Sequence, residues 1–444
     1  MNATRRMASL AVLIALCLFG LSAVPLAAQN AGAGAPAAQP KYTVAEYNAY
    51  TAAANEKNPA AQLKALDDFV AKYPNSELLR FVYPLYYKNY YSQKNFQKTI
   101  EYADKEIALG DKATPTDHYE AYYVRAVAYN NLQNPDVQTA KAARDAALAG
   151  LKSIDLVTKP EGVDQAKFDE QKKLSTIFFN GTAGSAALAA KDCAGAVESY
   201  KAVLAITPDD LTSDYNLGKA YTCENPPDQL DALWEFARAA TSKNANEAQS
   251  KQIKAYIRKL IANYQGGTVC DALTDAELNE LLQLASGSVN RPASYKLFSS
   301  ADLDTARKDM TIASVVTDLK AGGDKAKLTW TAACALEFPD VPGKIIDITP
   351  APDTVVLKNA FVTSDAEFEA ATTPNMDVAI KVADQPEAAK LEKGNAVRFT
   401  GTLESYDPDP AFMLHWDKAK VNAEDLPKAD KKPTAKKPAP KKPS

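Results

Sequence analysis

The sequence predicts a mainly α-helical protein, in which helical hairpins stack in an array and a small β-rich domain follows. Three observations favour this fold class. Residues 42–264 are rich in Ala and carry apolar residues at helical spacing. Gly184 and Gly218 stand inside helical patterns and are 34 positions apart (218 − 184 = 34). From residue 336 onward, short β-rich runs bounded by Pro, Gly, Asp and Asn replace the helical pattern.

Residues 1–28 are predicted to be a secretory signal peptide. Arg5 and Arg6 precede an apolar run at 10–21, and the small residues before position 29 suit cleavage after Ala28. The run is short for a transmembrane span, and no later stretch is apolar enough to be one. Residues 29–41 are predicted to be a flexible spacer, because Ala, Gly and Pro without periodicity build no core. We therefore expect an exported protein, with the periplasm favoured over secretion.

Residues 428–444 form a tail with seven Lys, four Pro and one Asp, and are predicted to be disordered. The formal net charge of the chain is −4; subtracting the leader's +2 and the tail's +6 leaves −12 for the body. The tail is either a solvated end or a contact for an anionic envelope polymer, a lipid or an acidic protein face. Nucleic acid is not expected as a partner of an exported protein.

The two glycines mark the clearest internal repeats. Glycine within a helix costs about 1 kcal/mol of helix propensity, which only close packing of two helices would justify. A ring can fill the gap beside such a glycine, and Pro can end the second helix. The pattern consists of Leu217, Gly218, Tyr221, Ala232, Phe236 and Ala239 in one unit, and of Gly184, Ala196, Tyr200, Val203 and Pro208 in the unit before it.

This pattern resembles that of tetratricopeptide repeats, whose length is 34 residues. Two units, 177–208 and 211–245, match it well, although Asp214 stands where the family often has Trp. An insertion at CENPPDQ lengthens one turn by two residues (232 − 196 = 36). Weaker units precede them, so the resemblance covers about half of the chain, residues 42–264. It implies an α-α superhelix of helical hairpins.

The resemblance also implies a binding face. Tetratricopeptide repeats usually recognise their ligands on the concave face made by the first helix of each unit. Tyr215 and Lys219, four residues apart, are predicted to share one exposed stripe, where a ring and a cation could hold an extended acidic peptide. Carried over position by position, the predicted peptide-binding residues are Lys88, Tyr91, Glu120, Tyr123, Asn130, Tyr215 and Lys219.

A run at 80–91 contains six aromatic residues among twelve. A helix buries only one stripe, so some of these Tyr side chains are predicted to be partly exposed. Such rings suit contacts with peptides or glycans.

The region after 264 divides into helices and strands. Thr274 and Glu277 fit a capping box, which predicts a helix from there to about Ala285 within a helical connecting region at 265–335. Five β-rich runs at 336–427 predict a small barrel or sandwich, and Gly401 in mid-strand predicts a bend or bulge. The stretch FTGTLESYDPDPAFMLHW loosely resembles the late strands of an OB-type barrel; an α+β domain without closure is the alternative.

Four cysteines remain after the leader, at positions 193, 223, 270 and 334. An even number fits an oxidising compartment, and four cysteines allow three pairings. On the repeat register, Cys193 and Cys223 fall at the same end of neighbouring hairpins, so we predict a Cys193–Cys223 disulfide. Four buried free thiols are the alternative.

Recognised catalytic motifs are lacking. Of the two histidines, His118 starts a predicted helix and His415 alternates with apolar residues on a strand; neither belongs to a nucleophile motif. Asp407 and Asp409 could suggest calcium ligands, but Asp-Pro pairs are more typical of turns. We expect no enzyme, no cofactor and no metal site.

The sequence therefore predicts an exported, non-enzymatic scaffold or adaptor that binds a protein or peptide in the cell envelope. The alternative is binding of an envelope glycan or small ligand through exposed Tyr residues or the β-rich domain, aided by the Lys-rich tail.

Overall fold

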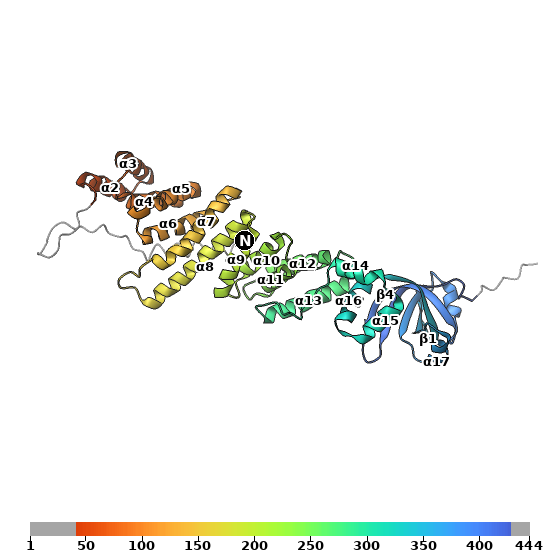
Figure 1. Ribbon diagram of the computed structural model, residues 1–444. Coiled ribbons are helices and arrows are strands. Elements are labelled where there is room, and N and C mark those ends of the chain that lie inside the picture. The colour runs from red at the N-terminus through yellow and green to blue at the C-terminus, as the bar shows by residue number, and fades with distance from the viewer. Residues whose placement is uncertain (1–40, 428–444) are drawn as a thin grey trace, which may run out of the picture. The chain divides into compact units, whose positions relative to one another are not determined.

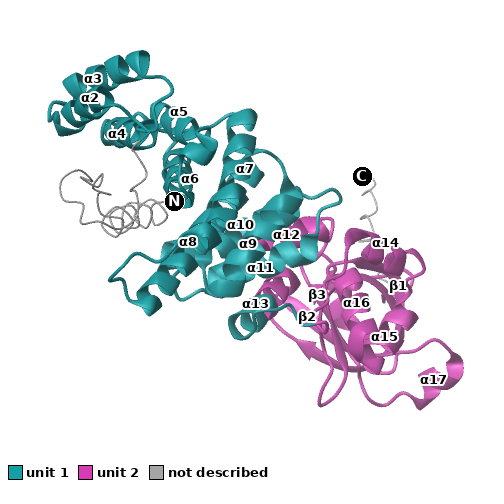
Figure 2. Cartoon of the chain, turned by 60° about the vertical axis from the view of Figure 1, so that its left-hand side comes forward, with its two compact units in different colours: residues 1–255, 281–292 teal, residues 256–280, 293–444 magenta. Residues whose placement is uncertain are grey.

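The computed structural model describes residues 41–427, which form two compact units (Figure 2). The first contains the described residues up to 255 together with 281–292, and the second contains 256–280 and 293–427. Three predicted segments lie outside the described residues: the signal peptide at 1–28, the spacer at 29–41 except for its last residue, and the tail at 428–444. Within residues 41–427, no helix has the length and apolar character needed to cross a membrane.

The first unit is an array of helical hairpins that follow one another in sequence order (Figure 1). Its helices are α2 (Val44–Asn55), α3 (Pro59–Lys72), α4 (Leu79–Ser92), α5 (Phe96–Ile107), α6 (Pro115–Asn130), α7 (Val137–Ser153), α8 (Gln165–Ala189), α9 (Cys193–Ile206), α10 (Leu211–Cys223) and α11 (Gln229–Thr241), with single 3₁₀ turns η1 (Gly110–Lys112) and η2 (Ile154–Leu156). Each helix packs on the next, and the first helices also contact one another, α4 with α6, α6 with α8 and α8 with α10. We call the surface that these four helices form the first-helix face.

At Gly184 in α8 and at Gly218 in α10, an aromatic ring of the next helix lies against the glycine. A Cβ atom at position 184 would lie 2.9 Å from the Tyr200 ring, and one at position 218 would lie 2.9 Å from the Phe236 ring. Each ring belongs to the second helix of the same hairpin. The same contact thus recurs after one repeat length, which confirms the predicted fold of tetratricopeptide-like hairpins.

We expect Gly218→Leu to lower the free energy of unfolding by about 1–3 kcal/mol, because the new side chain needs space that the Phe236 ring occupies. Thermal unfolding followed by circular dichroism would measure the change. Gly181→Ala in α8 is the matched control: a Cβ there meets nothing within 4 Å, so the midpoint should stay the same or rise. An unchanged midpoint in Gly218→Leu would contradict the packing.

Two further helices link the hairpins to the rest of the chain, α12 (Glu247–Tyr264) and α13 (Asp271–Gly287). The helix predicted to open with a capping box at Thr274 begins earlier, at Asp271. The Thr274 hydroxyl donates to the Cys270 carbonyl at 3.2 Å, and the buried Glu277 carboxylate accepts two hydrogen bonds from the Gln265 amide at 3.0 and 2.8 Å. The predicted capping box is wrong because both side chains have other partners.

The second unit combines short helices with a five-stranded sheet. In chain order, these helices and strands are α14 (Ser300–Lys308), α15 (Ile312–Ala321), α16 (Gly323–Ala333), β1 (Glu337–Pro350), β2 (Thr354–Phe361), α17 (Asp365–Ala370), β3 (Met376–Lys381), η3 (Pro386–Lys390), β4 (Ala396–Asp407) and β5 (Met413–Val421). The sheet closes into a barrel in the order β1-β2-β3-β5-β4, with β4 paired back to β1. The β3–β5 pair is parallel and the other pairs are antiparallel.

Alternating side chains from the strands fill the barrel. The buried rings of Phe338 and Phe399 meet Trp416 edge to face, with centroids 5.7 and 5.3 Å apart. Gly401 lies where the β4–β5 register shifts, and a Cβ there would lie 3.2 Å from the Cβ of Ala419. The predicted irregularity at Gly401 is confirmed, and closure of the sheet excludes the open α+β alternative.

The four described cysteines form two disulfides. Cys193 at the start of α9 is joined to Cys223 at the end of α10, with the Cα atoms 5.6 Å apart. Cys270, which precedes α13, is joined to Cys334, which follows α16, with a Cα separation of 5.7 Å. The two cysteines of each bridge therefore lie in the same unit.

Candidate functional site

The predicted peptide-binding residues all lie on first helices of the hairpins. They are Lys88 and Tyr91 on α4, Glu120, Tyr123 and Asn130 on α6, and Tyr215 and Lys219 on α10. The structure brings the first four together between α4 and α6. Lys88 is close enough to lower the pKa of Glu120, and Tyr91 is close enough to raise the pKa of Tyr123. The α10 residues lie further along the array, beyond α8.

Three carboxylates gather between α4, α5 and α6: Glu106, Asp117 and Glu120, which we call the acidic cluster. Burial raises the pKa of Glu106 well above its ordinary value, and the charges of Asp117 and Glu120 raise it further. Burial also raises the pKa of Glu120 to about 7, although the positive charge of Lys88 lowers it. The nearby lysine therefore does not offset the cost of burying these carboxylates.

The members of the acidic cluster differ in their partners. Asp117 forms an ion pair with Arg80 at 2.7 Å. The Glu106 and Tyr87 side chains are each 1% exposed, and the Tyr87 hydroxyl interacts with the Glu106 carboxylate. Burial, followed by the charges of Glu106 and Glu120, raises the pKa of Tyr87, so its hydroxyl lies near both carboxylates.

Sequence reasoning missed Glu106 and Tyr87. A signal for Glu106 exists: Thr99, Tyr102, Ala103 and Glu106 have the spacing of one helix stripe, and all four are buried. An acidic residue at the end of such a stripe indicates a buried carboxylate. Tyr87 could not be separated from its aromatic neighbours by spacing alone.

Tyr123 does not offer an exposed ring, which corrects the prediction. Its side chain is 8% exposed, and its ring packs against Phe178 and Phe179 with centroids 4.6 and 6.0 Å apart. Helix α8 supplies both covering rings. Tyr91 is half-buried, with its ring edge-to-face with Phe96 at 5.8 Å.

Two other predicted contacts, Asn130 and Tyr215, also take part in packing between helices. The Asn130 amide is exposed but donates to the Thr182 hydroxyl of α8 at 2.8 Å. Tyr215 is half-buried, and its ring meets Phe236 edge-to-face at 5.3 Å. Lys219 is exposed. The prediction that Tyr215 and Lys219 share one solvated stripe is therefore wrong for Tyr215, because α11 covers part of its ring.

This difference gives a test. We expect Tyr215→Ala to lower the free energy of unfolding by about 1–2 kcal/mol, because half-buried ring area and an edge-to-face contact are lost. Lys219→Ala, one turn away and exposed, should change it by about 0.5 kcal/mol or less. Urea unfolding of both variants measures the two effects. Equal stability of the two variants would place Tyr215 in solvent instead.

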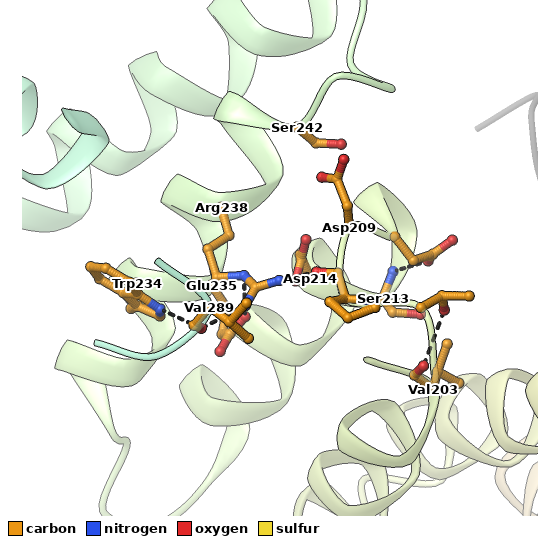
Figure 3. Close-up of polar contacts among 12 residues, drawn as sticks. Val203, Asp209, Ser213, Asp214, Trp234, Glu235, Arg238, Ser242 and Val289 are labelled. Carbon is orange, nitrogen blue, oxygen red and sulfur yellow. Dashed lines mark hydrogen bonds and ion pairs between the residues drawn. The ribbon is translucent and has the colours of Figure 1, made fainter. Parts of the chain in front are cut away.

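A buried polar network joins α10 to α11 (Figure 3). The Arg238 guanidinium lies 3.1 Å from Asp214 and 3.7 Å from Glu235, and donates to the carbonyls of Val289, at 2.5 Å, and Pro208. Burial raises the pKa of Asp214 to about 7 and that of Glu235 to about 8, whereas Arg238 lowers both. One guanidinium thus serves the buried carboxylate of Asp214 and the partly buried carboxylate of Glu235.

The same network holds the segment 288–292 on α11. The Val289 carbonyl accepts a second hydrogen bond from Trp234 Nε1 at 3.3 Å, and Arg291 forms an ion pair with Asp231 at 2.8 Å. Figure 3 shows the Trp234 and Arg238 side chains converging on Val289. Asp214, which stands where the family often has Trp, is therefore part of an interior support for the last hairpin and not of a binding surface.

The aromatic run at 80–91 is divided between core and surface. The Tyr86 ring stacks on Tyr102 at 4.0 Å, and its hydroxyl donates to Asp67 at 2.7 Å. Tyr83 and Tyr90 are half-buried and lie 6.3 and 5.5 Å from the Tyr102 ring. The predicted partial exposure of some of these rings is confirmed.

The histidines have polar neighbours that belong to the fold. His118 Nε2 lies 3.0 Å from the Gly110 carbonyl oxygen, and His415 Nε2 lies 2.9 Å from Asp407. His415 Nδ1 lies 3.8 Å from Asp377 on the adjacent strand. No group of three or more His, Cys, Asp or Glu residues within 41–427 is arranged to hold a metal ion.

The fold and the first-helix face define a helical-repeat protein with tetratricopeptide-like hairpins and a five-stranded barrel. No protein-family model matches the sequence, and no curated protein matches it. Among solved structures, the chain is similar to the TPR2AB-domain:pHSP90-complex of yeast Sti1, at 12% identity and a TM-score of 0.18, over 54% of this chain and 95% of that chain. The fold class rests on the helix packing described above.

Proposed function

We propose that the chain is a non-enzymatic scaffold that binds a protein or peptide on its first-helix face. The observation that carries this proposal is the grouping of exposed Lys88 with half-buried Tyr91 and Glu120 between α4 and α6. A ring, a cation and a carboxylate in one patch offer both apolar and charged contacts to peptide side chains. Burial of Tyr123 under α8 limits the patch on one side.

We propose export to the periplasm as the setting of this function. Two disulfides among the described residues support an oxidising compartment. We also propose that the closed barrel is of the OB type, because it has five strands and non-sequential strand order.

Binding of an envelope glycan is the second candidate function. It is supported by half-buried Tyr83, Tyr90 and Tyr91, whose rings could stack on sugars while their hydroxyls form hydrogen bonds. The Lys-rich tail at 428–444 would add attraction to an anionic polymer.

Capture from a cell-envelope fraction with the full chain as bait tests the two candidates. A peptide-binding scaffold should retain its partner when 428–444 is deleted, and should lose it in Lys88→Ala combined with Tyr91→Ala. Lys98→Ala, an exposed lysine on α5, is the control for loss of charge and should retain the partner. Undiminished capture by the double variant would contradict a site between α4 and α6. Salt-sensitive capture of a polymer that disappears with the tail would favour the glycan candidate.

A further inference from the structure

The two disulfides differ in how far a reagent in solution can reach them. In the first bridge Cys223 is exposed and Cys193 is half-buried, whereas in the second Cys270 is half-buried and Cys334 is fully buried. Cys223 is the last residue of α10, and the turn at 225–227 that follows it is exposed as well. The Cys193–Cys223 bridge therefore presents one cysteine to an attacking thiolate without any unfolding of the array.

The other half of this bridge is placed to act as a leaving group. Cys193 is the first residue of α9, where the free backbone N–H groups and the helix dipole stabilise a thiolate. The carboxylate of Asp192, the residue before it, would oppose this effect, but it is paired with Arg144 at 2.5 Å. A stabilised thiolate leaves faster in thiol–disulfide exchange.

The second bridge has the opposite arrangement. Attack on Cys334 is closed because that residue is fully buried. Attack on the half-buried Cys270 would expel Cys334 as a thiolate away from water, which burial disfavours. The two bridges of the chain should therefore react at very different rates with the same reagent.

We propose that the Cys193–Cys223 disulfide is a thiol–disulfide exchange site for a dithiol reductant. One thiolate of the dithiol attacks Cys223, the sulfur–sulfur bond of the bridge breaks, and Cys193 leaves as a thiolate that takes up a proton. The second thiol of the reductant then attacks its own sulfur in the mixed disulfide and releases Cys223. Two electrons and two protons pass to the bridge, and the reductant ends as a disulfide.

Reduction releases the end of α10 from the start of α9 but leaves the other contacts of these helices in place. Gly218 of α10 still packs against the Phe236 ring, and Lys201 of α9 still lies over the Tyr221 ring at 5.4 Å from its centroid. The array should therefore stay folded while residues 222–228 gain freedom. None of these residues belongs to the patch between α4 and α6, so the exchange site and the proposed function stand or fall separately.

Dithiothreitol acting on the folded full chain provides the probe. Acid quenching, alkylation and peptide mapping measure the reduction of each bridge with time. We expect Cys193–Cys223 to be reduced at least about tenfold faster than Cys270–Cys334, at a rate that increases in proportion to the dithiothreitol concentration. Equal rates for the two bridges, or a rate that does not depend on the concentration, would overturn the exchange site.

Glutathione identifies the residue that is attacked. Because it is a monothiol, it forms a mixed disulfide with one cysteine of the bridge and leaves the other as a thiol. Mapping after an acid quench should find glutathione on Cys223 and a free thiol at Cys193. Glutathione mainly on Cys193 would contradict the assigned roles of the two residues.

The double variant Cys270→Ser, Cys334→Ser is the matched control, since it keeps only the exposed bridge. The two replaced residues lie in the other unit, so the remaining bridge should react within about twofold of its wild-type rate. A much faster reaction in this variant would show that exchange needs a loosened fold, and would count against attack on the native chain.

Limited digestion with a Glu-specific protease tests the structural consequence. In the reduced and alkylated chain, cleavage after Glu224, which lies in the released turn, should be at least about fivefold faster than in the oxidised chain. Cleavage after Glu198, an exposed residue within α9, is the internal control and should keep its rate. No change at Glu224, or an equal acceleration at both positions, would overturn the local release.

Discussion

Replacing Arg238 by Met should lower the free energy of unfolding by about 3–5 kcal/mol near pH 8, because it leaves the buried Asp214 and the partly buried Glu235 without a counter-ion. It also removes the donor to the carbonyls of Pro208 and Val289. The segment 288–292 should then detach more readily from α11.

The loss should depend on pH with a definite sign. Burial raises the pKa of Asp214 to about 7 and that of Glu235 to about 8, so between about pH 4 and 8 the folded chain binds protons that the unfolded chain releases. The Asp214 and Glu235 carboxyl groups contribute to stability at pH values below the pKa values that they have in the unfolded chain. This contribution is lost as the pH rises through their folded pKa values of about 7 and about 8. Without Arg238 the pKa values rise further, so the variant should be weakened less at pH 5 than at pH 8.

Hydrogen exchange of α10 and α11, together with urea unfolding at both pH values, measures this effect. Arg144→Met is the matched control, because that guanidinium is partly exposed between Asp145 and Asp192 and should contribute about 0–1 kcal/mol. A loss in Arg238→Met that equals the control's, or that does not change with pH, would show that the buried network does not support the last hairpin.

Removing the Cys270–Cys334 disulfide should lower the free energy of unfolding by about 4 kcal/mol on the chain-entropy model, since the bridged residues are 64 positions apart. The Cys193–Cys223 bridge, with a separation of 30, should contribute about 3–4 kcal/mol. Double Cys→Ser variants of each pair, unfolded in urea, measure the two contributions.

Peptide mapping without reductant checks the pairing directly. It should yield both cross-linked peptide pairs, Cys193 with Cys223 and Cys270 with Cys334. Reductant should lower the free energy of unfolding of the wild type by about the sum of the losses in the two double variants. The bridges lie in different units, so their contributions should be independent. Free thiols at these positions, or any other pairing, would reject the two bridges.

The fold was predictable where a contact repeats locally. Gly184 and Gly218 each meet a ring from the next helix, and both partners lie within one hairpin, so the spacing of a few residue types encodes the contact. The barrel was predictable as five strands because apolar residues alternate along each run. Closure of the sheet into a barrel was one of several possibilities that the sequence left open, because the parallel pairing of β3 with β5 joins segments that no short pattern relates.

The binding face was predictable only as a set of helices. Helical spacing shows which stripe of α6 carries Tyr123, but not that Phe178 of α8 covers that ring. The same limit applies to Tyr215, which meets Phe236. Helical spacing can mark Glu106 as a buried carboxylate, but it does not show that Tyr87 lies beside it, since their shared burial depends on α4, α5 and α6 together.

The packing of each hairpin helix on the next has a consequence for the order of folding. Contacts between sequence neighbours close short loops, which costs little chain entropy, and arrays of this kind can grow hairpin by hairpin from any formed pair. In the barrel, by contrast, Phe338 of β1 must find Gly401 of β4 across most of the domain. High contact order slows folding, so we expect helical structure to precede barrel closure when the chain refolds.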